Sequence, residues 1–173
     1  MSANWYKEQP TNRNFLNPIG YLLKLEKFEG VDFFCQRANV PDVTMPTTEV
    51  ASPFRNLPII PGGGVSFGDF SVSFIVDEDL KNYNSIHKWM RDNGNADQMQ
   101  RTTSQNDILT NGQLHIVTSQ YNPAFVIDYR DIFPVSLSGL QFDATITDVE
   151  YITADVTFKH QQFFINDKNN HPL

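Results

Sequence analysis

The sequence predicts a mainly β protein, an antiparallel β-barrel or sandwich with one flanking α-helix and one long extended loop. Several short segments alternate apolar with polar residues, which is the period of a half-buried strand. Only one segment repeats its apolar residues at helical spacing, and another is both proline-rich and apolar. The length of 173 residues fits one domain that buries its own core.

The first elements expected along the chain are a flexible arm and a hairpin. Residues 1–14 are polar and contain Pro10, which is typical of a loose terminus. Residues 20–28 and 30–38 alternate in hydropathy on either side of Gly30. Because glycine suits a tight turn, we expect these two segments to pair as a β-hairpin.

Residues 39–64 form a long segment that is neither a strand nor a polar linker. They contain Pro41, Pro46, Pro53, Pro58 and Pro61 and end in three glycines. Each proline removes a ladder donor, so a central strand is excluded. An apolar segment this long is unusual inside a compact domain, and exposed apolar surface needs a cover. It is either a flap on its own domain or an arm or edge hairpin that docks on another subunit. The apolar residues expected at that contact are Val50, Phe54, Leu57, Ile59 and Ile60.

A strand and a helix follow the extended segment. Residues 66–76 predict a half-buried strand, with Phe70, Val72, Phe74 and Val76 on one face and Ser71 and Ser73 on the other. Residues 79–93 then predict an amphipathic helix on one face of the sheet, because apolar residues recur at helical spacing. These are Leu80, Tyr83, Ile86, Trp89 and Met90. Asp79 is the expected N-cap, and Asn93–Gly94 ends the helix.

The remainder of the chain predicts a loop and three more strands. Residues 94–110 are polar and are expected to form the loop. Residues 112–120 and 123–133 alternate as strands, Pro134 begins a connection, and residues 151–165 form the last strand. The expected total is about seven strands. We expect residues 15–166 to form the domain and residues 167–173 a short C-terminal tail.

Composition and charge exclude several classes of function. The net charge is −7, whereas proteins that grip nucleic acid usually carry a basic face. Cys35 is the one cysteine, so an internal disulfide is excluded. The N-terminus lacks the apolar stretch of a signal peptide. No apolar run approaches the roughly 20 residues that a membrane helix needs, so we expect no membrane partner.

The titratable residues show no pattern typical of catalysis, of a cofactor or of a metal site. The four histidines lack ligand spacing, and the acidic run Asp77–Asp79 lacks a calcium-loop pattern. Asp128 and Asp131 flank Arg130, for which a local ion pair is the simplest interpretation. Since nucleophile, base and metal ligands are all missing from the pattern, we expect a protein that acts by contact and not an enzyme.

The order of the motifs resembles the tail tube proteins of contractile-tailed, T4-type bacteriophages and the related tube-fold ring proteins of their baseplates. The order is a hairpin, a Pro-rich apolar loop, "FGDFSVSFIVDED", "NYNSIHKWM", "DIFPVSLSGLQFD" and "ITADVTFKHQQFF". The matching residues are Phe70, Val72, Phe74, Asp77, Glu78, Trp89, Phe133, Pro134, Val156, Thr157 and Phe158. The resemblance covers residues 15 to 165, whereas the 94–110 loop and the N-terminal arm match nothing in the family.

The resemblance implies a structural virion protein of the phage tail, assembled in the host cytoplasm. Its subunits would form stacked hexameric rings whose sheets join into one inner barrel, with residues 39–64 reaching the next ring. The implied partners are further copies of itself, the tail sheath protein and baseplate ring proteins. DNA would pass transiently through the lumen at ejection, past a wall that does not hold phosphates. Candidate lumen residues are Ser71, Ser73, Thr153, Asp155 and Thr157.

The sequence leaves three functions open besides that of a repeating tube subunit. The first is a baseplate ring that initiates the tube, although such proteins carry extra segments that this sequence lacks. The second is a tube protein of type VI secretion or a related contractile device, which shares the fold. The third belongs to a different class, a monomeric β-barrel that binds a small ligand in its mouth, and it leaves residues 39–64 poorly explained.

Overall fold

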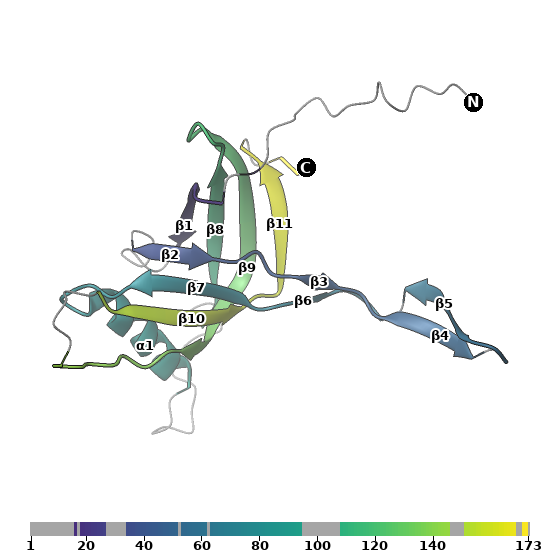
Figure 1. The fold of residues 1–173 in the computed structure, drawn as a ribbon, viewed down its shortest axis with the longest axis horizontal. Helices are drawn as coiled ribbons and strands as arrows, with labels where there is room; N and C mark the ends of the chain where they lie inside the picture. The colour runs from purple at the N-terminus through teal and green to yellow at the C-terminus, as the bar shows by residue number, and fades with distance from the viewer. Residues whose placement is uncertain are drawn as a thin grey trace.

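The computed structural model describes residues 16, 18–26, 34–51, 53–61, 63–94, 108–145, 151–168 and 171–172. Within these residues the fold is antiparallel β with one helix (Figure 1), which confirms the predicted fold class. The flexible N-terminal segment expected at residues 1–14 and most of the expected 94–110 loop lie outside the described residues.

The elements follow one another in this order: β1 (Tyr21–Leu25), β2 (Cys35–Ala38), β3 (Val43–Thr44), β4 (Thr47–Ala51), β5 (Asn56–Pro61), β6 (Ser66–Phe67), β7 (Phe70–Ile75), α1 (Lys81–Asn93), β8 (Thr110–Val117), β9 (Pro123–Leu137), β10 (Thr153–Lys159) and β11 (Gln162–Asp167). Strands β3 and β6 pair only with each other, and so do β4 and β5.

The other seven strands form one hydrogen-bonded network that the long strand β9 divides in two. Its order is β1-β8-β9-β10-β7-β2, and β11 also pairs with β9. The first part of β9 pairs with β8 and β11, and its last part pairs with β10. We call β1, β8, β11 and the first part of β9 the A sheet, and β2, β7, β10 and residues 133–137 of β9 the B sheet. The two sheets cross steeply in Figure 1.

The chain changes sheet at two adjacent points. Asp131 of β9 has a φ of 55°, which is uncommon for a residue with a side chain. Beside it, His160 and Gln161 separate β10 from β11, and the Gln161 amide donates to the Arg130 carbonyl at 3.1 Å. Strands β10 and β11 therefore run in succession along one edge of β9 and turn with it.

The core fills the space between the two sheets and the helix. Phe70, Val72 and Phe74 of β7 alternate inward as predicted, as do Val156 and Phe158 of β10. The rings of Phe70 and Tyr129 stack across the sheets with centroids 4.4 Å apart. The other buried apolar residues are Leu23, Leu25, Ile86, Trp89, Leu114, Val126, Ile127, Ile132 and Ala154. The B sheet thus packs one face against the core, fully buried in β7 and β10 and partly buried in β2 and at Leu137 of β9.

Helix α1 closes one end of this core. Ile86 and Trp89 are buried, and Tyr83 and Met90 pack half-buried beside them. The Trp89 indole N–H donates to the Ile108 carbonyl at 3.0 Å, and its ring lies 6.3 Å from that of Phe158. The predicted placement of the helix on the sheet is confirmed, and Gly94 follows its end as expected.

The N-terminus of α1 differs from the prediction. Leu80, and not Asp79, occupies the N-cap position, with a φ of 56° and no side-chain capping bond. Asp79 instead pairs with Lys81. Leu80, expected in the buried stripe, is 41% exposed, because its backbone turns the side chain away from the helix face that enters the core.

Three predictions about the strands were wrong. The segments expected to pair as a hairpin have separate partners, since β1 pairs with β8 and β2 pairs with β7. Pro134 lies inside β9, next to a shift in its register with β10, where a missing N–H is tolerated. The expected last strand is interrupted between β10 and β11.

Replacing Trp89 with alanine should destabilise the folded chain by about 3–5 kcal/mol, the usual effect of emptying a large buried aromatic site. The side chain is only 6% exposed. Chemical denaturation measures the change, and Trp89→Phe is the control, because it keeps most of the apolar packing and removes the N–H that bonds to Ile108. A midpoint unchanged by Trp89→Ala would contradict the packing of α1.

His160 should make folding sensitive to acid. Its ring lies among Phe67, Tyr129 and Phe163, and neither ring nitrogen has a hydrogen-bond partner in the described structure. Burial lowers the pKa of His160 below its ordinary value of 6.5, although the charge of Asp69 opposes this. The unfolded chain then binds more protons below pH 6.5, so stability is lost as pH falls through that value.

The check is to measure unfolding free energy above and below pH 6.5 for the wild type and for His160→Phe. The variant should lose less stability on acidification, because its ring has no proton to bind. Equal losses in the two proteins would show that His160 does not contribute to the acid sensitivity.

Candidate assembly surfaces

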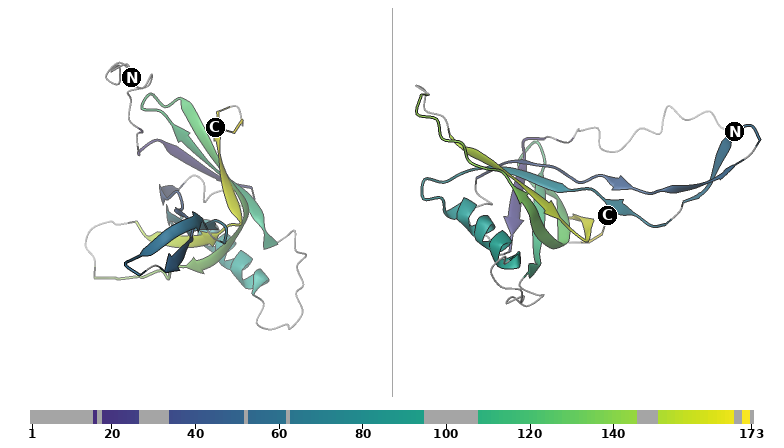
Figure 2. Two further views of the ribbon diagram at one scale, coloured as in Figure 1. Left: turned by 90° about the vertical axis from the view of Figure 1, so that its right-hand side faces the viewer. Right: turned by 90° about the horizontal axis from the view of Figure 1, so that it is seen from below.

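Residues 43–67 form a two-stranded ribbon, which we call the arm. Strands β3 and β6 pair at its base, with the hydroxyls of Thr44 and Ser66 2.6 Å apart. Strands β4 and β5 pair further out, with a bulge between Thr48 and Glu49. Figures 1 and 2 show the arm projecting away from the two sheets. The prediction of an extended segment is confirmed, and the segment has the paired strands of the edge hairpin that was one of its two interpretations as a contact element.

Hydrogen bonds fix the base of the arm to the B sheet. The Asn39 side chain donates to the Asp69 carbonyl at 3.0 Å and accepts from the Ser71 amide at 2.6 Å. The Gly68 amide donates to the Asp42 carbonyl at 2.9 Å. These bonds hold both arm strands at the point where β7 begins, so the arm continues the direction of the B sheet strands.

The arm exposes apolar side chains to an unusual extent. Phe54 is 98% exposed and Val50 is 48% exposed. Leu57, Ile59 and Ile60, the other predicted contact residues, lie on β5, and their side chains are outside the described structure. A two-stranded ribbon with no core of its own is marginal in water. The arm is therefore expected to bury its exposed apolar side chains against another surface.

The outward face of the B sheet is polar and rich in hydroxyl groups. Ser71 and Ser73 of β7 lie opposite Thr157 and Asp155 of β10, and the Ser73 hydroxyl donates to the Asp155 carboxylate. Thr153 lies further along the same face. The structure thus brings the five predicted lumen residues to one surface. That they line a lumen stays a prediction.

Two further residues share this polar face and were missed from the sequence. Arg37 of β2 lies opposite Ser73, and Ser136 of β9 lies opposite Thr157. A signal for Ser136 was present, because Ser136 and Ser138 alternate with Val135 and Leu137. Placing Pro134 at a strand end hid this alternation. With Arg37 and Asp155 both present, the middle of the face carries one charge of each sign.

Both lateral edges of the B sheet are open in the described structure. Strand β2 pairs with β7 only. Residues 133–137 of β9 pair with β10 on one side, and the pairing of β8 on the other side ends at Ile132. Backbone groups on an open edge can pair with another chain. The sheet thus offers one pairing edge at each side.

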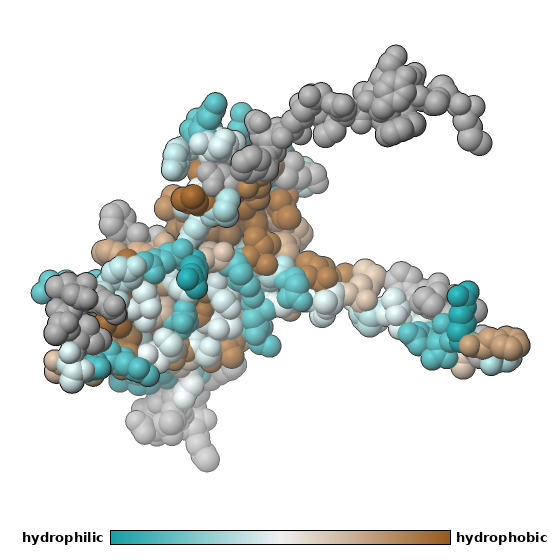
Figure 3. Space-filling view, in the orientation of Figure 1, coloured by the Kyte–Doolittle hydropathy of each residue, from teal (hydrophilic) through white to brown (hydrophobic). Residues whose placement is uncertain are grey.

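Apolar side chains also gather around β11 and the base of the arm (Figure 3). Val43, Phe164 and Ile165 are between 41% and 55% exposed. With Phe67 and Phe163 they line a shallow groove. This groove adds a side-chain surface to the backbone edges available for contact.

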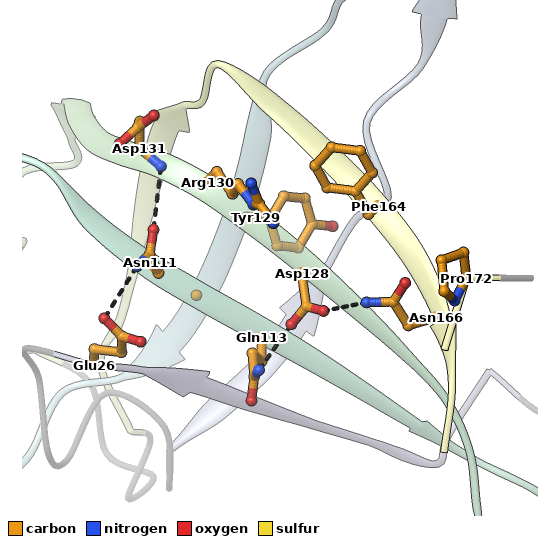
Figure 4. A pocket seen from close by; sticks show the side chains of 11 residues that line it. Glu26, Asn111, Gln113, Asp128, Tyr129, Arg130, Asp131, Phe164, Asn166 and Pro172 are labelled. Atoms are coloured by element: carbon orange, nitrogen blue, oxygen red, sulfur yellow. Dashed lines mark hydrogen bonds between the residues drawn. The ribbon is translucent and has the colours of Figure 1, made fainter. Parts of the chain in front are cut away.

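A polar concavity of about 790 Å³ lies on the outer face of the A sheet (Figure 4). Asp128 accepts a hydrogen bond from Gln113 at 2.8 Å and another from Asn166. The Arg130 guanidinium lies over the ring of Phe164, 4.9 Å from its centroid. No ion pair of Arg130 with Asp128 or Asp131 is present here, so that prediction was wrong.

The described residues contain no group of three or more His, Cys, Asp or Glu side chains placed to hold a metal ion. Among the helices in the described part of the chain, none is long and apolar enough to cross a membrane.

Several solved structures resemble this fold. One is the tube-terminating cap of the anti-feeding prophage, with a TM-score of 0.64 and 15% identity over 94% of this chain and 98% of that one. Another is an extracellular contractile injection system, in its PVC sheath-tube complex in the extended state (TM-score 0.61, 12% identity, 96% and 99% covered). A third is the six-fold symmetrised baseplate of the anti-feeding prophage (TM-score 0.60, 12% identity, 85% and 91% covered).

At these identities the likeness establishes the fold. A comparison with curated proteins finds no match. A family model described as phage tail tube protein matches residues 7–166, which is nearly the whole chain and includes the arm, both sheets and the helix. The resemblance inferred from the order of the motifs is thereby confirmed, and the chain belongs to the phage tail tube protein family.

Proposed function

We propose that this chain is the structural subunit of the inner tube of a contractile phage tail and acts by forming stacked hexameric rings. The observation that carries the proposal is the B sheet, which has one face in the core, one polar face and an open edge at each side. Copies placed side by side would continue such a sheet. The six-fold symmetry of the related baseplate supports a ring of six.

The number of strands suits this arrangement. The B sheet has four strands, and each neighbouring pair is antiparallel. Because four is even, β2 of one copy runs opposite to β9 of the copy beside it when a rotation about an axis along the strands relates them. Each contact between copies is then an ordinary antiparallel pair. A closed ring of such sheets has no open edge left.

In this ring the polar faces would line the channel. They present Ser71, Ser73, Thr153, Asp155 and Thr157, with Arg37 and Ser136 in addition. The opposite charges of Arg37 and Asp155 offset each other, so this wall would not bind DNA tightly, because tight binding depends on several uncompensated cations. A hydroxyl-rich wall of nearly neutral charge would let DNA slide at ejection. The tail sheath would surround the ring, and baseplate proteins would start the tube.

A baseplate or terminal ring is the second candidate function, and the likeness to a tube-terminating cap favours it. A monomeric ligand-binding barrel has less support, because side chains such as Phe70, Tyr129 and Phe158 fill the space between the sheets. The proposed setting is the virion, with assembly in the host cytoplasm.

Electron microscopy of the purified protein at rising concentration, beside a sizing column, tests the proposal. Long hollow tubes are the expected result, since both the edges and the arm are available for contact. Single rings that never stack would favour a terminal ring. A chain that stays monomeric at every concentration would contradict self-assembly.

Deleting residues 44–62 should leave a folded domain and abolish tubes, because no residue of this range belongs to the described core. Gly63 and Gly64 have positive φ and would allow the shortened turn. Acidic replacements at both Ile59 and Ile60 should act in the same way with less disturbance. Thermal melting checks the fold, and microscopy checks assembly. Full-length tubes from the deletion variant would exclude the arm as a stacking element.

A further inference from the structure

A small apolar cleft lies at the end of the B sheet opposite the arm. Its volume is about 220 Å³, and an apolar cavity of about 150 Å³ already holds a benzene ring. Val76, Leu80 and the acids Asp77 and Glu78 line one side. The connection between β9 and β10 lines the other side with Leu140, Phe142, Tyr151 and Ile152.

The cleft is open and apolar in a way that the isolated subunit does not explain. Phe142 is 77% exposed and Tyr151 is 65% exposed. Leu80 is held in the left-handed backbone region, which is unfavourable for a bulky residue. Strain of this kind persists where the surrounding structure imposes it, often at contact sites. Here it places an apolar side chain at the mouth of the cleft.

The tip of the arm has the complementary chemistry. Phe54 is almost fully exposed, and its neighbour Arg55 is an exposed cation. Asp77 and Glu78 provide two acids at the cleft. An aromatic side chain with a cation beside it therefore matches an apolar cleft with an acidic border.

The two surfaces cannot meet within one chain. Strand β7 begins at the base of the arm and ends at the cleft, and six residues span about 20 Å at about 3.3 Å each. Figure 2 shows the arm leaving one end of the molecule while the β9–β10 connection leaves the other. A second copy displaced along the strands, however, presents its cleft towards the first copy's arm.

We propose that Phe54 of one copy inserts into the cleft of a second copy, with Arg55 beside Glu78 at its border. The two partners use different surfaces, so this is a head-to-tail contact. Such contacts continue without limit unless a rotation closes them, which is the property that stacking requires. This inference rests on the proposed function, because it supplies the acceptor surface for the arm in the stacked rings.

Charge exchange tests the pairing. Arg55→Glu and Glu78→Arg should each reduce mean tube length at least tenfold, because each places like charges at the contact. A chain with both replacements restores opposite charges and should recover at least half of the wild-type length. Phe54→Ser should shorten tubes as strongly, with no rescue by Glu78→Arg. Lys88→Glu reverses an exposed charge on α1, away from both surfaces, and is the matched control.

Thermal melts and ring formation separate failure of this inference from failure of the proposed function. Wild-type tubes together with normal tubes from either single reversal would overturn the docking and leave the tube function standing. Short tubes from both reversals without rescue in the double variant would overturn the pairing of Arg55 with Glu78. A wild-type chain that forms neither rings nor tubes would contradict the proposed function, and the docking with it.

Discussion

The backbone hydrogen bonds at the edges of the B sheet are the constraint on which the rest of this structure depends. One face of the sheet packs against the A sheet and α1, and the other face is largely polar, with exposed apolar side chains only at the β9 edge, where Phe133 and Val135 lie. The edges, at β2 and at residues 133–137 of β9, have no further strand beside them in the described structure, so backbone groups there can pair with another chain. Strand addition from a neighbouring copy satisfies those groups without changing either face. The fold is thus suited to lateral repetition, which is how a member of the tail tube family would form a ring.

The proposed stacking of rings depends on a different kind of contact. The arm leaves the sheet along the direction of the strands and carries apolar side chains with almost no cover. The apolar cleft lies at the far end of the same strands. In the proposed tube, backbone pairing joins copies within a ring and side-chain packing joins successive rings. Because the two contacts use separate surfaces, substitutions in the arm can abolish stacking and still leave rings intact.

Local sequence patterns predicted much of the fold. The errors concerned strand pairing between segments that are distant in the sequence. The alternation in β7 and the helical period of α1 identified the faces that enter the core, since each pattern is complete within about fifteen residues. The partners of β1 and β2 are distant in sequence, so adjacency alone wrongly suggested a hairpin. Pro134 predicts a strand end, because a proline fits inside a strand only at an irregularity. The register shift between β9 and β10 that accommodates it cannot be read from the sequence. The polar face was predicted in part, whereas the cleft joins residues near 80, 140 and 151 that no local pattern connects.

Amide hydrogen exchange, compared between isolated subunits and the assembled polymer, tests the central claim most directly. The outward-pointing amides of β2 and of residues 133 and 135–137, which are not bonded to β7 or β10, should exchange readily in the subunit and become protected on assembly. Amides of the centre of β7, which are already paired on both sides, should change little and provide the internal reference. Polymers in which the edge amides of β2 and β9 exchange as fast as in the subunit would contradict a tube built by continuing the B sheet.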